Sequence, residues 1–177
     1  ASVGGETVQE TGGGVCQGSS TVYLAALRSN LEIVERYPHG YITRYVPDGM
    51  DATVYYGAKD FRFRNNTPFP IQVVGSVSGR SLTVSILGTK SDNITVEMTN
   101  QTVGTTGYKT VYKVDSSLPA GSTRVSVTPY AGYTVKVYRN LYENGKLKDT
   151  KLESTSVYRS RDKVVLVSPE DAAQYGL

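Results

Sequence analysis

One cysteine, one histidine and one aspartate stand out in this sequence because their types and order suit nucleophilic catalysis. Cys16 is the only cysteine and His39 the only histidine of the chain, and Asp51 follows them. An imidazole can take the proton of a thiol, and a carboxylate can orient that imidazole and stabilise its charged form. The order Cys16, His39, Asp51 therefore predicts a nucleophile, a base and an orienting group.

The expected position of Cys16 favours its thiolate. Residues 16–29 carry apolar side chains at helical spacing, so we expect a helix whose first turn holds the thiol. The free N–H groups at a helix N-terminus carry partial positive charge, which stabilises a thiolate. Three glycines at 12–14 let the chain turn sharply and leave the sulfur approachable. The Gln17 side chain and the Cys16 N–H are candidate donors to an oxyanion.

Each of these residues also has a structural interpretation. A free cysteine is often a small buried hydrophobic residue, and a histidine between Pro38 and Gly40 can lie in an exposed turn without a role. Asp51 can cap or end a strand. Zinc is a rival use of Cys16 and His39, but it would need two further ligands from carboxylates or water, which is unusual for a structural site. The sequence therefore predicts no metal and no cofactor.

The first half of the chain is expected to place these residues with one main helix and an antiparallel sheet. Alternating apolar residues bounded by turn signals predict six strands, at residues 31–36, 41–46, 52–56, 60–64, 70–77 and 81–87. His39 and Asp51 would then lie near strand ends beside the helix. We expect this α+β domain to cover residues 1–90.

The second half changes to short strands rich in Thr, Ser and Val, without a helical pattern. We expect an all-β domain at residues 91–177, with strands at 94–98, 108–114, 124–128, 133–141, 146–152 and 163–167. Asn144-Gly145 predicts a tight hairpin turn, since both residues tolerate positive φ. Residues 168–177 show no strand pattern and are expected to fray.

Composition excludes some classes of function. The net charge is +3 without a Lys/Arg cluster, which argues against a nucleic-acid partner. No run of about 18 apolar residues is present, so we expect no membrane-spanning segment in this chain. A single cysteine permits no internal disulfide and is compatible with export. The chain begins at Ala1 rather than Met and reads as a piece of a longer protein.

Residues 11 to about 88 resemble the VanW family. The resemblance rests on Gly12-Gly13-Gly14-Val15-Cys16-Gln17, Ala25-Ala26-Leu27, His39, Tyr45-Val46-Pro47, Asp51-Ala52-Thr53-Val54, Asp60-Phe61 and Pro70-Ile71. It implies an exported, extracellular protein of the cell envelope of a Gram-positive bacterium, from a family named for its association with vancomycin-resistance clusters. A preceding membrane or lipid anchor is compatible with this. The resemblance does not define a biochemical role.

The second half is similar to a G5 domain, a β-module of cell-wall proteins. The similar segments are Leu118-Pro119-Ala120-Gly121, Tyr130-Ala131-Gly132-Tyr133-Thr134-Val135 and Tyr142-Glu143-Asn144-Gly145-Lys146. The resemblance implies binding to peptidoglycan or an amino-sugar glycan. The sequence assigns no individual residues to glycan binding.

A cysteine that opens a helix, followed by a histidine and an aspartate on strands, is also similar to the layout of transglutaminase-like and papain-like cysteine enzymes. We therefore expect an envelope enzyme that hydrolyses or transfers an amide of cell-wall peptide: Cys16 attacks, His39 moves the proton and Asp51 orients His39. The alternative is a non-catalytic wall-binding or scaffolding protein. A regulatory partner of other envelope enzymes is a third option and would need a broad apolar patch.

Overall fold

The computed structural model describes residues 2–3, 6–7 and 14–177, so most of the polar N-terminal lead-in lies outside the described residues. Strands β1 (Ser2–Val3) and β2 (Glu6–Thr7) form a short antiparallel pair. The remaining elements are one helix, ten strands and one 3₁₀ turn in the described part of the chain. The prediction of one helix with mostly antiparallel strands is confirmed.

Helix α1 (Val15–Arg28) matches the predicted helix to within one residue at each end. Its buried face includes Tyr23, Leu24 and Leu27, at the spacing expected for one side of a helix. The helix ends at Arg28, and Asn30, just beyond its C-cap Ser29, has a φ of 58°. Asparagine tolerates this left-handed backbone conformation better than most residues, so it stops the helix at low cost.

The strands that follow α1 in the first half form two antiparallel pairs. β3 (Glu32–Glu35) pairs with β4 (Arg62–Arg64), and β5 (Ile71–Ser78) pairs with β6 (Ser81–Gly88). The predicted strands at 41–46 and 52–56 are wrong, because this region is irregular apart from an isolated bridge between Tyr55 and Lys59.

Hydrogen bonds to side chains explain why residues 51–53 do not form a strand. The Ala52 N–H donates to Ser20 Oγ at 2.9 Å, and the Asp51 carbonyl accepts from Arg36 Nε at 2.7 Å. Backbone groups that are satisfied in this way are not available for pairing with a neighbouring strand.

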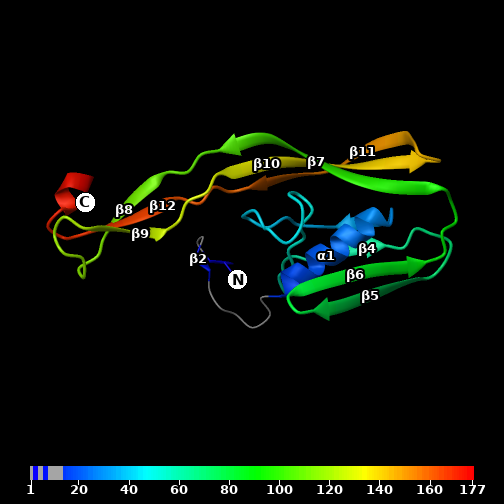
Figure 1. The fold of residues 1–177 in the computed structure, drawn as a ribbon, viewed down its shortest axis with the longest axis horizontal. Helices are drawn as coiled ribbons and strands as arrows, with labels where there is room; N and C mark the ends of the chain where they lie inside the picture. Colours follow the sequence, from blue (N-terminus) through cyan, green and yellow to red (C-terminus); the bar gives the residue numbers. More distant parts are fainter. Residues whose placement is uncertain (1, 4–5, 8–13) are drawn as a thin grey trace.

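The second half is built from two three-stranded sheets. One has the order β11-β10-β7, and the other has the order β8-β12-β9 with β8 parallel to β12. The strands are β7 (Ile94–Thr106), β8 (Thr110–Val114), β9 (Thr123–Val127), β10 (Gly132–Glu143), β11 (Lys146–Tyr158) and β12 (Lys163–Val167). The long strands β7, β10 and β11 run past α1, and the smaller sheet lies at the opposite end of the molecule from β5 and β6 (Figure 1).

Two predictions about the ends of these strands have different outcomes. The hairpin turn is confirmed, with φ of 48° at Asn144 and 77° at Gly145. The expected fraying of residues 168–177 is wrong. Ser168 is buried, Asp171 accepts from the Gly121 N–H at 2.6 Å, and the 3₁₀ turn η1 (Ala172–Tyr175) follows. Side-chain and backbone hydrogen bonds hold this segment without any strand pattern.

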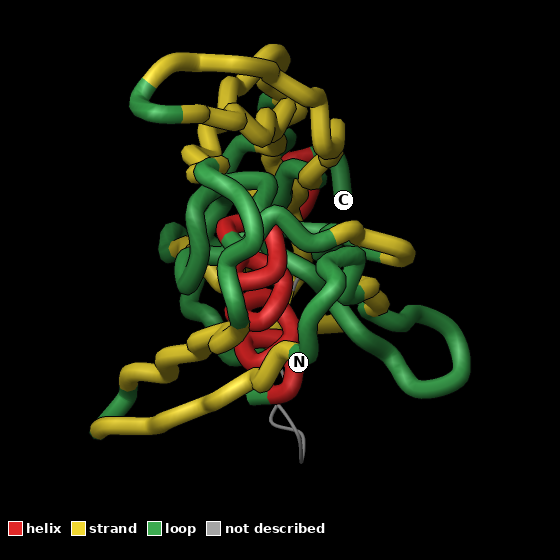
Figure 2. The backbone as a smooth tube through the Cα atoms, turned by 90° about the vertical axis from the view of Figure 1, so that its right-hand side faces the viewer, coloured by secondary structure: helices red, strands yellow, loops and turns green. Residues whose placement is uncertain are grey.

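One hydrophobic cluster joins the two halves of the chain. It contains Leu24 of α1, Met50, Val135 and Val137 of β10, and Tyr158 of β11. Seen along the long axis of the molecule, the helix is surrounded by loops and strands (Figure 2). The core therefore includes residues from both predicted domains.

Candidate active site

Cys16 lies in the first turn of α1 and is half-buried. Its Sγ lies 3.4 Å from Thr53 Oγ1 and 3.7 Å from the Val54 carbonyl oxygen. The Ser20 hydroxyl donates to the Ala52 carbonyl at 3.1 Å and accepts from the Ala52 N–H. These bonds tie the helix to residues 52–54 and fix the position of the thiol.

His39 and Asp51 form a closely held pair. His39 Nδ1 lies 2.6 Å from Asp51 Oδ2, and the His39 backbone N–H donates to the same oxygen at 2.8 Å. Because a carboxylate only accepts, Nδ1 carries a proton, and Nε2 is the ring nitrogen that gains or loses the second proton. Asp51 is 1% exposed, so this orientation is fixed in the interior.

The second oxygen of Asp51 is also bound. Arg36 Nη2 donates to Oδ1 at 3.2 Å, and the Tyr158 hydroxyl donates to the same oxygen. Arg36 additionally donates to the Asp51 carbonyl, to the Gly49 carbonyl at 2.9 Å and to Ser156 Oγ at 2.7 Å. The buried carboxylate therefore faces a guanidinium and a phenol, as a buried charge requires.

These contacts shift three pKa values. Burial alone would raise the pKa of the Asp51 carboxyl, but hydrogen bonds from His39 and Tyr158 and the charge of Arg36 hold it below its usual range. Burial would lower the pKa of His39, but its hydrogen bond to Asp51 and the neighbouring thiol of Cys16 raise it. Burial would also raise the pKa of Cys16, but hydrogen bonding to Thr53, the Val54 backbone and His39 lowers it. The thiolate and the imidazolium thus stabilise each other.

Tyr45 is a further residue at this site. Its hydroxyl lies 3.1 Å from His39 Nε2. Burial is the main cause that raises the pKa of Tyr45 to about 12, so the phenol stays protonated at neutral pH. Tyr45 therefore contacts the nitrogen of the imidazole that does not face Asp51.

Gln17 follows Cys16 on the first turn of α1 and is half-buried. Its backbone carbonyl accepts from the Thr21 hydroxyl at 2.7 Å. The role of its side chain as an oxyanion donor stays a prediction.

The structure thus places His39 and Asp51 in direct contact, and it places Cys16 close enough to His39 for each to shift the pKa of the other. Sequence reasoning missed the partners of these residues. Thr53, Arg36 and Tyr45 all lie within residues 11–88, which resemble the VanW family, but their spacing from Cys16 carries no recognised motif. Tyr158 lies 107 positions from Asp51, and no pattern in the sequence connects the two.

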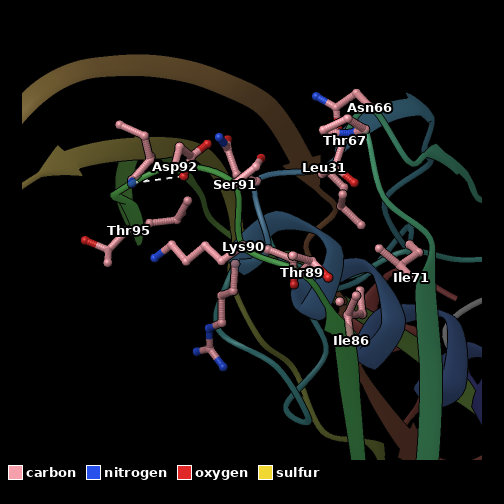
Figure 3. A pocket seen from close by; sticks show the side chains of 17 residues that line it. Leu31, Asn66, Thr67, Ile71, Ile86, Thr89, Lys90, Ser91, Asp92 and Thr95 are labelled. Carbon is pink, nitrogen blue, oxygen red and sulfur yellow. Dashed lines mark hydrogen bonds between the residues drawn. The ribbon is translucent and has the colours of Figure 1, made fainter.

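A separate cavity of about 490 Å³ lies where α1 ends and β7 begins (Figure 3). Its lining includes Leu31, Thr67, Ile86 and Lys90, and none of its lining residues belongs to the group around Asp51. Within the residues that the structure describes, no group of three or more His, Cys, Asp or Glu side chains is arranged to hold a metal ion. No helix in that part of the chain is long and apolar enough to cross a membrane.

Comparison with known proteins gives two family matches. The model described as "VanW like protein" matches residues 1–87, and the model described as "G5 domain" matches residues 92–169. The chain is 44% identical over 84 residues to "Uncharacterized protein YoaR" of Bacillus subtilis (strain 168). This match covers 48% of the chain and 28% of YoaR, so the chain spans less than a third of that relative.

Two solved structures are similar to the chain. "Crystal structure of HP0197-G5" has 24% sequence identity and a TM-score of 0.24, and covers 42% of this chain and 96% of that chain. "IgA1 Protease G5 domain structure" has 16% identity and a TM-score of 0.29, and covers 44% of this chain and 94% of that chain.

The predicted resemblances are confirmed by the family matches. G5 domains are associated with binding of cell-wall glycan, and VanW and G5 domains are typical of cell-envelope proteins. Their presence together suggests a protein associated with the cell wall. The chain therefore carries a VanW-like domain at residues 1–87, followed by a G5 domain at residues 92–169.

Proposed function

We propose that this protein is a cysteine-dependent enzyme that hydrolyses or transfers an amide of cell-wall peptide. The observation that supports this best is the buried Asp51 carboxylate 2.6 Å from His39 Nδ1, with His39 and Cys16 each shifting the pKa of the other toward its charged form. A thiolate next to an oriented imidazolium is the arrangement that nucleophilic catalysis by cysteine uses.

The proposed reaction has two steps. Cys16 Sγ attacks the carbonyl carbon of an amide and His39 holds the thiol proton; the C–N bond then breaks, and the proton goes to the leaving amine. This leaves a thioester on Cys16. Water attacks the thioester in hydrolysis, or a second amine attacks it in transfer, and His39 takes the proton of the attacking group. The C–S bond then breaks, which releases the acid or the new amide and restores the Cys16 thiolate beside protonated His39.

The remaining roles follow from the site. Asp51 orients His39, and the Cys16 N–H with the Gln17 side chain would donate to the oxyanion. The resemblance of this layout to transglutaminase-like and papain-like enzymes rests on the helix that carries the thiol, and it stays part of the proposal. The domain boundaries expected from the sequence, residues 1–90 and 91–177, also stay part of the proposal.

Mass spectrometry of the intact protein tests the proposal. The protein is incubated with soluble peptide fragments of peptidoglycan, quenched in acid and weighed. We expect an added acyl mass on Cys16 that hydroxylamine removes, since hydroxylamine cleaves thioesters. Cys16→Ala should carry no adduct and His39→Gln should accumulate it far more slowly. Absence of any adduct with every fragment tested, together with unchanged fragments, would refute the enzymatic function.

A second proposal concerns the G5 domain and the location of the protein. Its match at residues 92–169 supports binding to peptidoglycan or an amino-sugar glycan. The location that we propose, outside the membrane of a Gram-positive bacterium, rests on the resemblance of the first half of the chain to the VanW family. Sedimentation with insoluble peptidoglycan tests this. We expect wild-type protein and Cys16→Ala to sediment equally, because binding by the G5 domain does not use the thiol. This non-catalytic binding would be the whole function if no adduct forms on Cys16.

A further inference from the structure

The carboxylate of Asp51 needs donors on both oxygens to hold a single orientation. The terminal torsion of an aspartate side chain is broad, so one hydrogen-bonded oxygen leaves the group able to turn. Oδ2 accepts from the backbone and the ring of His39. Oδ1 accepts from Arg36 and from Tyr158. The orientation of the imidazole therefore depends on what fixes Oδ1.

Both groups that fix Oδ1 depend on strand β11. Tyr158 ends this strand, is 2% exposed and packs in the cluster with Leu24 and Val135. Ser156, two residues earlier on the same strand, is 1% exposed and accepts from Arg36 Nη1 at 2.7 Å. Side chains two apart on a strand point to the same face, so one face of β11 supplies both contacts.

The backbone just after β11 also contacts the segment that carries His39. The Arg159 N–H donates to the Gly40 carbonyl at 2.8 Å. Gly40 follows His39 directly, and a Cβ at Gly40 would come within 2.7 Å of Arg159 Nη2. Residues 156–159 thus contact the segment at His39 and the carboxylate that orients it.

We propose that Tyr158 and Ser156, which lie in the G5 domain, are positioning residues of the site in the VanW-like domain. The G5 domain then has a second role besides wall binding, because it supplies one wall of the site and holds Asp51 against His39. This inference rests on the proposed function, since it assigns residues that act through the Asp51–His39 pair.

The ionisable groups around this pair come from several elements. Cys16 faces it from α1, Arg36 from the end of β3, Tyr45 from the following loop and Tyr158 from β11. A readout that follows the Asp51–His39 bond itself is therefore needed, because titration of any one group reflects all of them.

The test measures exchange of the His39 Nδ1 proton with water by NMR. His39 is the only histidine, so in full-length ¹⁵N-labelled protein its ring signals need no separate assignment. In wild-type protein we expect a protected Nδ1 proton. In Tyr158→Phe we expect exchange roughly tenfold faster, because the loss of one hydrogen bond to a charged group lets the carboxylate turn more often. Tyr133→Phe is the matched control, since Tyr133 pairs with Tyr158 in the sheet and packs on the same cluster but donates nothing to Asp51.

A second variant tests the inference independently if Tyr158→Phe does not fold. Ser156→Ala removes the hydroxyl oxygen that accepts from Arg36. Arg36 should then hold Asp51 less firmly, so exchange of the His39 Nδ1 proton should again be faster than in wild-type protein. Equal exchange rates in wild-type protein and in the folded variants would overturn the inference, and so would an unprotected Nδ1 proton in wild-type protein. The two proposals can fail separately. If Tyr158→Phe accelerates exchange of the Nδ1 proton but no adduct forms on Cys16, the proposed reaction is refuted and the positioning role of β11 stands.

Discussion

Asp51 is the residue on which the geometry of the site depends. It is almost completely buried, yet its pKa lies below its usual range because His39, Tyr158 and Arg36 outweigh the effect of burial. Its removal would leave the Arg36 guanidinium, itself 7% exposed, without a compensating charge.

Asp51→Asn should therefore destabilise the protein. We expect the free energy of unfolding at pH 7 to fall by about 3 kcal/mol, which is typical for removal of one partner of a buried ion pair. Because the pKa of Asp51 is depressed in the folded state, its contribution is present above its ordinary pKa of about 3.9 and is lost as the pH falls through the folded value. Urea unfolding of both proteins at pH 7 and at pH 3 measures this difference.

The control is Asp48→Asn, which changes an exposed carboxylate in the neighbouring turn. It should change the free energy of unfolding by less than about 0.5 kcal/mol. An Asp51→Asn protein as stable as this control at pH 7 would show that the buried carboxylate is not held by its donors.

At this scale the sequence pointed to the residues of the proposed catalytic set but not to their environment. Cys16 and His39 could be found because each is the only residue of its type in the chain, and Asp51 followed from their order. Arg36 and Tyr158 could not be found in this way. Arginine and tyrosine are common in this chain, and their role depends on contacts between segments far apart in sequence.

The loop from the end of β3 to Asp51 is the element that places the site. The sequence predicted strands at 41–46 and 52–56, because apolar residues alternate there. The structure instead satisfies the backbone at residues 51–53 with Ser20, Arg36 and the Tyr37 carbonyl. Alternation alone could not predict this, since side chains from other elements supply the hydrogen bonds.

Gly49 allows this loop to pack closely against β10. Its φ is +84°, and a Cβ there would lie 2.6 Å from Val137 Cγ2 and 3.0 Å from Val135 Cγ1. Gly49→Ala should therefore lower the free energy of unfolding by about 2 kcal/mol or more, from backbone strain together with overpacking. Thermal and urea unfolding measure this loss.

Gly57→Ala separates the two causes. Gly57 has a φ of +78°, but a Cβ there meets nothing within 4 Å. This variant should lose only about 1 kcal/mol from the backbone conformation. Equal losses at Gly49 and Gly57 would contradict the close contact between the loop and β10.

The whole molecule shares one core between its two family domains. Leu24 and Met50 of the VanW-like domain pack with Val135, Val137 and Tyr158 of the G5 domain. Arg139 of β10 adds polar contacts across the same junction, donating to the Leu31 carbonyl at 2.8 Å and to Asn30 Oδ1 at 3.1 Å. The two domains therefore bury part of their apolar surface against each other.

Leu24→Ala should consequently destabilise both domains together. We expect a loss of about 2–5 kcal/mol, as for other buried leucines, in a single unfolding transition. NMR signals from α1 and from β10 should disappear at the same urea concentration. Leu147→Ala, at an exposed position of β11, should change stability by less than about 0.5 kcal/mol. Separate transitions for α1 and β10 would contradict a shared core.

The sequence predicted the order of the two domains but not this junction. The change in composition near residue 90 marks where one family resemblance ends and the other begins. It carries no information on packing, because β10 has the same alternating pattern whether its apolar face meets its own sheet or a helix from the other domain.

The most direct measurement of the central claim is the rate at which iodoacetamide alkylates Cys16 as a function of pH. Only the thiolate reacts, and Cys16 is the only cysteine, so the midpoint of the profile reports its pKa. We expect a midpoint below the free-thiol value of about 8.5, because His39, Thr53 and the Val54 backbone stabilise the thiolate. His39→Gln should move the midpoint upward. A wild-type midpoint at or above 8.5, unchanged in His39→Gln, would contradict an activated thiol at this site.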